Sequence, residues 1–259
     1  MAELVASSLI VFRAKTSRKI ESVKIQLFLS VVGMHKIRAI LFDLDNTLVD
    51  FIHMKQESCK AAAQAMAAAG LRMQETEAYE RLIKTYFSVG IESDNAFSEF
   101  LKKEGQFDHK ILAAAINAYL DAKNKCLKPY PNVKPVLKTL QRRCIFLSVV
   151  TDAPKTKAYQ RLLSMGIEPY FKFVVGYEDT NNPKNTGLPL LLALDMLRKQ
   201  MPDLTNNEIL MVGDSMERDL VPAKKLGLRT ALSKYGQKTA EAGTPDYELT
   251  DIKDLVDIL

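Results

Sequence analysis

Two carboxylic acids lie one residue apart where a short apolar run ends. The run Ile40-Leu41-Phe42 is followed by Asp43 and, after one leucine, by Asp45. Two neighbouring carboxylates repel each other, and burying them removes favourable hydration. Acids placed in this way can hold a metal ion, attack an electrophile or carry a proton, although acids also cap ordinary turns. The first hypothesis is that Asp43 and Asp45 do chemistry at the end of a strand.

Other polar residues follow later strand-like runs in the same way. In chain order they are Thr151 and Asp152 after residues 144–150, Lys184 after 171–175, and Asp214 and Asp219 after 209–212. The carboxyl ends of parallel strands meet at one edge of a sheet, where α/β proteins bind their ligands. One pair of acids would be weak evidence, but four strand ends carrying polar groups in this order strongly indicate a single site.

The elements that must position these residues alternate between short apolar runs and amphipathic segments. The predicted strands are residues 37–44, 144–150, 171–175, 209–212 and 228–232. The predicted helices are residues 133–142, 155–165, 188–199 and 216–226. Strands that alternate with helices indicate a parallel sheet covered on both faces, so we expect an α/β fold with a Rossmann-like core.

One long segment breaks this alternation. Residues 54–127 contain no convincing strand and instead show four helical stretches, the first of them alanine-rich and ending at Gly70, a common helix stop. Three prolines within residues 128–135 mark the return to the alternating pattern. We expect an all-helical cap domain at 53–128, inserted into an α/β core domain made of 34–52 and 129–259. Residues 1–33 are expected to be an N-terminal extension, with Met34 as a candidate start.

Composition excludes several classes of protein. The 259 residues are 47% hydrophobic and 26% charged, which is ordinary for a soluble globular protein. The net charge of +5 is mild and its basic residues are scattered, so we expect no nucleic-acid partner. No apolar run approaches the ~20 residues that span a membrane, so we expect no membrane partner. Three widely separated cysteines argue against disulfides or a zinc site and fit a cytoplasmic location.

The motifs at the strand ends resemble those of the haloacid dehalogenase-like (HAD) superfamily of aspartate-nucleophile hydrolases. The sequence DLDNT, which begins at Asp43, is similar to the first motif of the superfamily. Thr151 and Lys184 take the places of its second and third motifs, and GDSMERD, which ends at Asp219, is similar to its fourth. The helical insertion lies where this superfamily carries its C1-type cap.

The resemblance implies a mechanism and a cofactor. Asp43 would be the nucleophile that forms an aspartyl-phosphate, while Asp45 would protonate the leaving oxygen and then activate water. A carboxylate that attacks an anionic phosphate is repelled, so a cation, here Mg²⁺, must sit between them. The implied magnesium ligands are the carboxylates of Asp43 and Asp214, the backbone carbonyl of Asp45 and, in support, Asp219.

The phosphoryl oxygens would be bound by the Thr151 hydroxyl and the Lys184 ammonium. Two departures from the superfamily's pattern stand beside them. Asn185 follows Lys184 where a proline is common, and Asp152 places an extra acid near the phosphate. Asp152 is expected to face away from the site or to pair with Lys155.

The cap offers weaker candidates for contact with the rest of a substrate. They are His53, Lys55 and Gln56 just after the first motif, and Lys84, Tyr86 and Asp94 at turns of the cap. For each of them, a packing or surface role is the commoner explanation. Substitutions at His53 or Lys55 are expected to alter the choice among substrates more than the chemistry itself.

The resulting hypothesis is a Mg²⁺-dependent phosphatase that hydrolyses a small phosphorylated metabolite through an aspartyl-phosphate. A phosphomutase of the same superfamily would share every core motif. An inactive HAD-like binding module would have lost a nucleophile or a metal ligand, and this chain has lost neither. A dehalogenase would not need Asp45 or Asp214.

Overall fold

Six short runs of mostly apolar residues form one parallel sheet. The computed structural model describes residues 37–259, and the extension expected at 1–33 lies outside them. The strands are β1 (Ala39–Phe42), β2 (Phe146–Val150), β3 (Val174–Val175), β4 (Ile209–Gly213), β5 (Arg229–Ser233) and β6 (Tyr247–Leu249). Their order is β3-β2-β1-β4-β5-β6, and all neighbours are parallel. Every residue of β1 and β4 is buried, as expected of strands covered on both faces.

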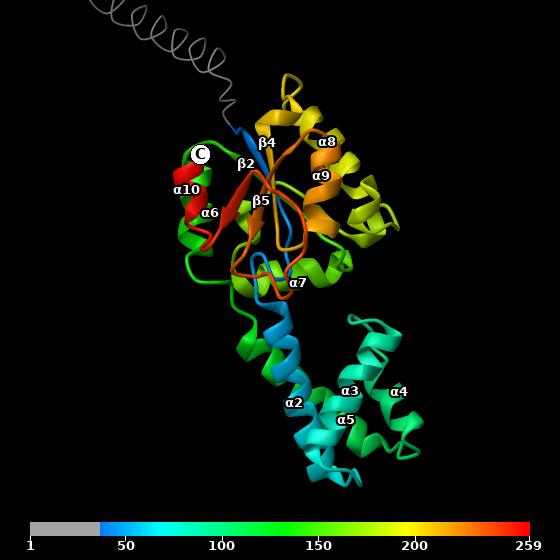
Figure 1. Cartoon of the computed structure of the whole chain (residues 1–259). Coiled ribbons are helices and arrows are strands. Elements are labelled where there is room, and N and C mark those ends of the chain that lie inside the picture. Colours follow the sequence, from blue (N-terminus) through cyan, green and yellow to red (C-terminus); the bar gives the residue numbers. More distant parts are fainter. Residues whose placement is uncertain (1–36) are drawn as a thin grey trace, which may run out of the picture. The chain divides into compact units, whose positions relative to one another are not determined.

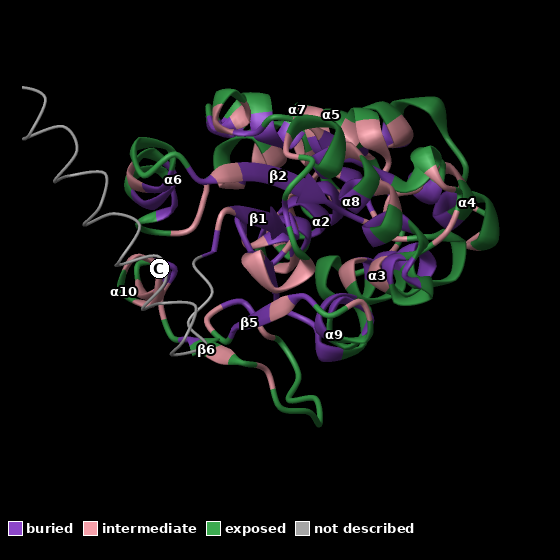
Figure 2. Ribbon diagram, turned by 90° about the horizontal axis from the view of Figure 1, so that it is seen from above, coloured by how far each residue is buried: buried purple, intermediate pink, exposed green. Residues whose placement is uncertain are grey.

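Helices cover both faces of this sheet. They are α6 (Val133–Arg142), α7 (Lys155–Met165), α8 (Leu188–Gln200), α9 (Val221–Lys225) and α10 (Asp254–Ile258). In Figure 1, α6 and α10 lie on one side of the strands, and α8 and α9 lie on the other. Figure 2 shows that the central strands β1 and β2 are largely buried and that the exposed residues lie on the outer faces of the helices and in loops. The predicted α/β fold with a Rossmann-like parallel sheet is confirmed.

The strand order places a crevice beside β1. The chain moves outward from β1 to β2 and β3 and then returns to β4 on the other side of β1. Loops that leave neighbouring strands in opposite directions open a ligand-binding crevice at this switch point. Phe42 is in register with Val149 of β2 and Val212 of β4, and the N–H of Asp43 donates to the carbonyl of Val212 at 2.8 Å. The residues that follow these three strands therefore meet at one edge.

Four helices occupy the segment between β1 and α6. They are α2 (Phe51–Ala69), α3 (Glu75–Val89), α4 (Ala96–Lys103) and α5 (His109–Cys126). Helix α2 begins at the N-cap Asp50 and ends at Gly70, whose φ of 119° suits a residue without Cβ. Its small residues Ala62 and Ala63 share a core cluster with Ala115 of α5, which allows the two helices to pack closely. Residues Arg38–Leu259 form one compact unit, so the division into a core and a cap domain stays a prediction.

The structure differs from the predicted elements mainly after β4. Residues 216–226 do not form one α-helix: Met216–Leu220 makes a π-helical turn, and α9 follows it. The N–H of Leu220 donates to the Ser215 carbonyl five residues back, and Pro222 has no N–H to continue a regular helix. The two short elements β6 and α10 were not predicted, because three and five residues give no readable periodicity. In residues 37–259 no helix is both long enough and apolar enough to cross a membrane.

Candidate active site

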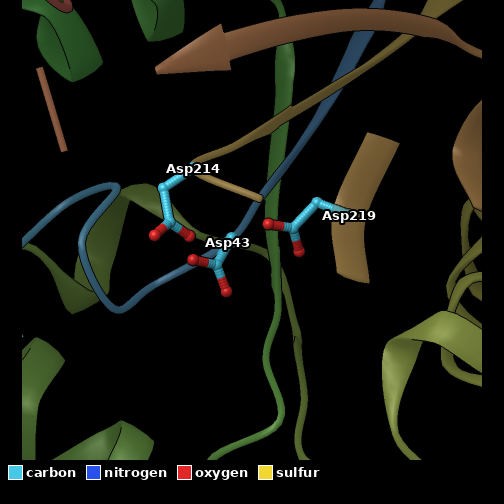
Figure 3. Close-up of side chains that lie close together, drawn as sticks. All are labelled: Asp43, Asp214 and Asp219. Atoms are coloured by element: carbon cyan, nitrogen blue, oxygen red, sulfur yellow. The ribbon is translucent and has the colours of Figure 1, made fainter. Parts of the chain in front are cut away.

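Three aspartates from two strand ends form the centre of the site (Figure 3). Asp43 follows β1, Asp214 follows β4, and Asp219 reaches the same place from the π-helical turn. One carboxylate oxygen of each lies within 4.8 Å of the others, and all three residues are buried. We call these residues the acid cluster. Gly213 makes their approach possible, because a Cβ at this position would lie 2.4 Å from the carboxylate of Asp219.

The Lys184 ammonium lies against the acid cluster. Its Nζ is 2.6 Å from Oδ1 of Asp219 and also contacts Oδ1 of Asp43, and its side chain is 2% exposed. Burial alone would lower the pKa of this lysine, but the charges of Asp219 and Asp43 outweigh burial and raise it above its usual value. Lys184 therefore stays charged and compensates one of the three carboxylates.

The remaining negative charge of the acid cluster suits a metal ion. Burial raises the pKa of Asp214 and of Asp219, and the nearby charge of Asp43 raises both further. Oδ1 of Asp214 is buried without a hydrogen-bond partner among residues 37–259, and Nη2 of Arg218 lies 3.5 Å from it. Several carboxylate oxygens converging on one point are what a hard divalent cation binds. The residues present therefore fit a divalent cation.

Asp45 pairs with an arginine rather than with the acid cluster. Its Oδ2 is 3.1 Å from Nη1 of Arg161, a buried residue of α7. Burial raises the pKa of Asp45 to about 7, with Arg161 opposing the rise and Asp43 adding to it. The second amino group of Arg161 contacts the carboxylate of Glu92, in the loop between α3 and α4. Asp45 can therefore gain or lose a proton near neutral pH while Arg161 holds its carboxylate.

The loop after β1 gives the two acids their different surroundings. Asn46 has a φ of 61°, a left-handed conformation that asparagine tolerates, and its N–H donates to the Val49 carbonyl at 2.7 Å. The Thr47 hydroxyl donates to Oδ2 of Asp43 at 3.1 Å, which orients that carboxylate. Gly236 packs directly on this loop, because a Cβ there would overlap the carbonyl oxygen of Asn46 at 1.5 Å. The loop is thus held by its own hydrogen bonds and by the close packing of Gly236.

Thr151 and Asp152 come from the end of β2. Thr151 is buried and lines the cavity that these strand ends enclose. Its hydroxyl oxygen accepts the N–H of Ala153 at 3.1 Å, which leaves the hydroxyl proton free to donate. Oδ1 of Asp152 accepts the backbone N–H of Lys184 at 2.7 Å. Lys155 pairs instead with Asp179 at 2.8 Å. The expectation that Asp152 faces away or pairs with Lys155 was therefore wrong, and this acid fixes the loop that carries Lys184.

The catalytic cavity formed by these residues has a volume of about 410 Å³. Its floor consists of the strand-end residues Asp43, Asp45, Thr151 and Lys184. Its other walls include Phe51, Ile52, Phe87, Ile91, Glu92 and Arg218. Sequence reasoning missed Glu92, Arg161 and Arg218. Arg218 lies within the GDSMERD motif and could have been noticed, whereas nothing in the sequence connects residues 92 and 161 with residue 45.

The cap candidates divide into two groups. His53, Gln56 and Lys84 are exposed and line neither the catalytic cavity nor its neighbour. Lys55, Tyr86 and Asp94 line a second cavity of about 510 Å³ next to α7. His53, Lys55 and Gln56 lie on the same helix but differ in exposure. Lys55 is buried and lines a cavity, whereas His53 and Gln56 face solvent.

Comparison with known proteins agrees with this geometry. Residues 40–233, more than half of the chain, match the model of the haloacid dehalogenase-like hydrolase family. The chain is 31% identical over 227 residues to a glyceraldehyde 3-phosphate phosphatase of Methanocaldococcus jannaschii, covering 86% of this chain and 97% of the relative. It is 28% identical over 222 residues to a phosphoglycolate phosphatase of Aquifex aeolicus, covering 86% and 96%.

A solved structure shows the same fold. The HAD phosphatase from Thermococcus onnurineus is similar with a TM-score of 0.64 and 23% identity, over 86% of this chain and 97% of that one. The superfamily resemblance that four short motifs predicted is thereby confirmed. The chain belongs to the haloacid dehalogenase-like hydrolase family, in which it is a hydrolase of phosphoric monoesters.

Proposed function

We propose that this protein is a Mg²⁺-dependent phosphatase that hydrolyses a small phosphorylated metabolite through an aspartyl-phosphate on Asp43. The observation that carries the proposal is the acid cluster at the carboxyl edge of the sheet, where Asp43 lies beside Asp214, Asp219 and Lys184. A buried nucleophile among acids is repelled by an anionic substrate unless cations compensate it. Lys184 supplies one such cation, and the uncompensated carboxylates leave room for another.

Oxygen atoms of four aspartates are proposed to hold the metal ion. The proposed ligands are the carboxylates of Asp43 and Asp214 and the backbone carbonyl of Asp45, with Asp219 in support. Bound there, Mg²⁺ would offset the negative charge between nucleophile and phosphate and polarise the phosphoryl oxygens. Oδ1 of Asp214, which is buried and accepts no hydrogen bond from residues 37–259, supports this assignment.

The remaining steps fall to named side chains. Asp43 attacks phosphorus, while the Thr151 hydroxyl and the Lys184 ammonium donate to the phosphoryl oxygens as their charge grows. Asp45 gives a proton to the leaving oxygen and later takes one from the attacking water. A pKa of about 7 suits both roles, because each protonation state is populated near neutral pH.

The substrate is proposed to be a small phosphate ester. The relatives named above act, by their names, on glyceraldehyde 3-phosphate and on phosphoglycolate, two esters of a few carbon atoms. The catalytic cavity of about 410 Å³ is of a size for such molecules. A cytoplasmic location is part of this proposal, and the three free cysteines of the chain fit it.

The proposal is tested with purified protein, p-nitrophenyl phosphate and a panel of sugar phosphates and phosphorylated acids. We expect release of inorganic phosphate with Mg²⁺, loss of activity with a chelator, and recovery when Mg²⁺ is returned. Undiminished turnover after thorough metal removal would remove the metal from the mechanism. Transfer of the phosphoryl group to a second sugar, without release of phosphate, would instead identify a phosphomutase.

A further inference from the structure

The second cavity, of about 510 Å³, adjoins the catalytic cavity. Residues from α2, α3, α4, α5 and α7, and from the loop between α3 and α4, line it. Glu92 lines both cavities. Phe51 of the catalytic cavity and Lys55 of the second one lie four residues apart on α2, about one helical turn or ~6 Å along its axis. The two cavities therefore lie next to each other along the first turns of α2.

The Lys55 ammonium is buried in the wall of the second cavity and forms no ion pair with a carboxylate of residues 37–259. The residue is 4% exposed. Its Nζ lies 3.4 Å from the centre of the Tyr86 ring and donates to the Tyr119 hydroxyl at 3.0 Å. The ring faces of Tyr86 and Tyr119 and the Tyr119 hydroxyl compensate this buried cation in part. They leave donors of the ammonium unused. Burial accordingly lowers the pKa of Lys55 to about 8.

The acids of this cavity already have cationic partners. Glu92 pairs with Arg161, and Asp94 pairs with Lys157 at 2.7 Å. Lys123 of α5 also lines the cavity and, within the described part of the chain, has no carboxylate partner. Burial and the charge of Arg161 lower its pKa. The cavity thus has two ammonium groups without a counter-charge, and its polar wall suits an anion.

We propose that the second cavity receives the carboxylate of a substrate that carries this acid beyond its phosphate ester, with Lys55 as the main contact. The inference rests on the phosphatase function proposed above. The phosphate end occupies the catalytic cavity at Lys184, and the acid end passes Glu92 to reach Lys55. The substrate class is therefore a phosphorylated hydroxy acid. Phosphoglycolate belongs to this class because it has a carboxylate, whereas glyceraldehyde 3-phosphate does not.

A matched pair of substrate series tests the proposal on the full chain. The first series consists of phosphate esters of hydroxy acids of increasing chain length, beginning with phosphoglycolate, and the second of the corresponding primary amides. We expect the wild-type protein to prefer the acid over the amide at one chain length. Lys55→Met should lower kcat/KM for that acid about 10–100-fold, mostly through KM, because it removes a buried charge-assisted hydrogen bond. The amide should change less than about threefold.

Two further variants separate a specific contact from damage to the fold. Lys55→Arg keeps the charge and should retain part of the preference for the acid. Lys84→Met makes the same change on an exposed face of α3 and should leave both series unaltered. Equal losses on acid, amide and p-nitrophenyl phosphate in Lys55→Met would overturn the inference, since they would mark Lys55 as structural.

The outcome also distinguishes this inference from the function on which it rests. Hydrolysis of both series without preference for the acid would overturn the role of Lys55 and leave the phosphatase intact. No hydrolysis of any ester would instead reject the phosphatase. Free butyrate, a carboxylate without a phosphate, serves as a further probe. If butyrate changes the turnover of p-nitrophenyl phosphate in the wild type but not in Lys55→Met, and acid substrates are not preferred, Lys55 belongs to a separate anion site. That result would also overturn the substrate assignment.

Discussion

The two cavities hold buried charge of opposite sign. In the catalytic cavity, the three aspartates of the acid cluster face the Lys184 ammonium and the Arg218 guanidinium, which lies 3.5 Å from Asp214, so negative charge is still in excess. In the second cavity the acids are already paired, and Lys55 and Lys123 have no carboxylate partner within residues 37–259. Buried charge is costly without compensation. The imbalance in each cavity therefore favours a cation in the first and an anion in the second, as proposed above.

The two cavities also differ in how the fold builds them. Loops at the ends of β1, β2, β3 and β4 hold the residues proposed to be catalytic, and strand pairing brings these loops to one edge. Five helices, α2, α3, α4, α5 and α7, and the loop between α3 and α4 hold the residues of the second cavity. In the function and the substrate contact proposed above, the chemistry belongs to the sheet edge and the selection of the substrate to the helices.

Asp43→Asn should produce the largest change, and it should be confined to the catalytic cavity. Without a carboxylate at this position no aspartyl-phosphate forms, so phosphate release should fall at least about 10⁴-fold on every ester. The variant should still fold, and it should be more heat-stable than the wild type without metal, because one repelling charge is gone. Mass spectrometry of quenched wild-type protein should locate the phosphate on a peptide containing Asp43. Phosphate on another residue would contradict the assignment.

Asp45→Asn should separate the two acids of the first motif by the leaving group. The variant keeps the nucleophile and its own backbone carbonyl but cannot protonate the leaving oxygen. Turnover of an alkyl phosphate should fall by about 10²–10⁴-fold, whereas formation of the phosphoenzyme from p-nitrophenyl phosphate should fall much less. Rapid-quench measurement of both steps checks this. Equal losses for the two esters would show that Asp45 does not act as the general acid.

Arg161 pairs with Asp45 of the catalytic cavity and with Glu92, which lines both cavities, so its replacement should affect both. Arg161→Met leaves Asp45 and Glu92 without their cationic partner, so we expect a loss of about 1–3 kcal/mol in the free energy of unfolding. Turnover of alkyl phosphates should fall about 10–100-fold, and Arg161→Lys should restore part of it. Denaturant titration together with leaving-group comparison measures both effects. Full activity on alkyl phosphates in Arg161→Met would show that Asp45 needs no partner.

The smallest effect expected is a dependence of metal stabilisation on pH. The folded-state pKa of Asp214 is raised above its ordinary value of 3.8, so without metal the protein loses stability as pH rises from that value through the raised one. Saturating Mg²⁺ should therefore raise Tm by about 5–10 °C near pH 8 and by much less near pH 5. Asp214→Asn should flatten this difference. A Mg²⁺ effect in that variant as large as in the wild type would place the ion elsewhere.

Part of the site could be predicted from the sequence because its residues follow strands directly. Asp43, Thr151 and Asp214 each follow an apolar run directly, Lys184 lies in the longer loop after another, and parallel strands bring such positions to one edge. Their convergence in the structure agrees with that expectation, while the roles assigned to them stay predictions. The alternation of strands and helices likewise gave the fold class, because hydrophobic periodicity is local.

What the tertiary structure decided depends on contacts between distant residues. Asp45 and Arg161 are 116 residues apart, and neither position carries a local signal for the other. Asp152 lies one residue from Thr151 in sequence, yet its partner is the backbone of Lys184 on a different loop. His53 and Lys55 looked equivalent in the sequence, and the rotation of α2 buries one and exposes the other. The sequence by itself determined the fold class, five of the six strands and the polar residues that follow them, since short-range patterns encode these. Packing decided which charges are compensated, because compensation depends on distances that no spacing along the chain specifies.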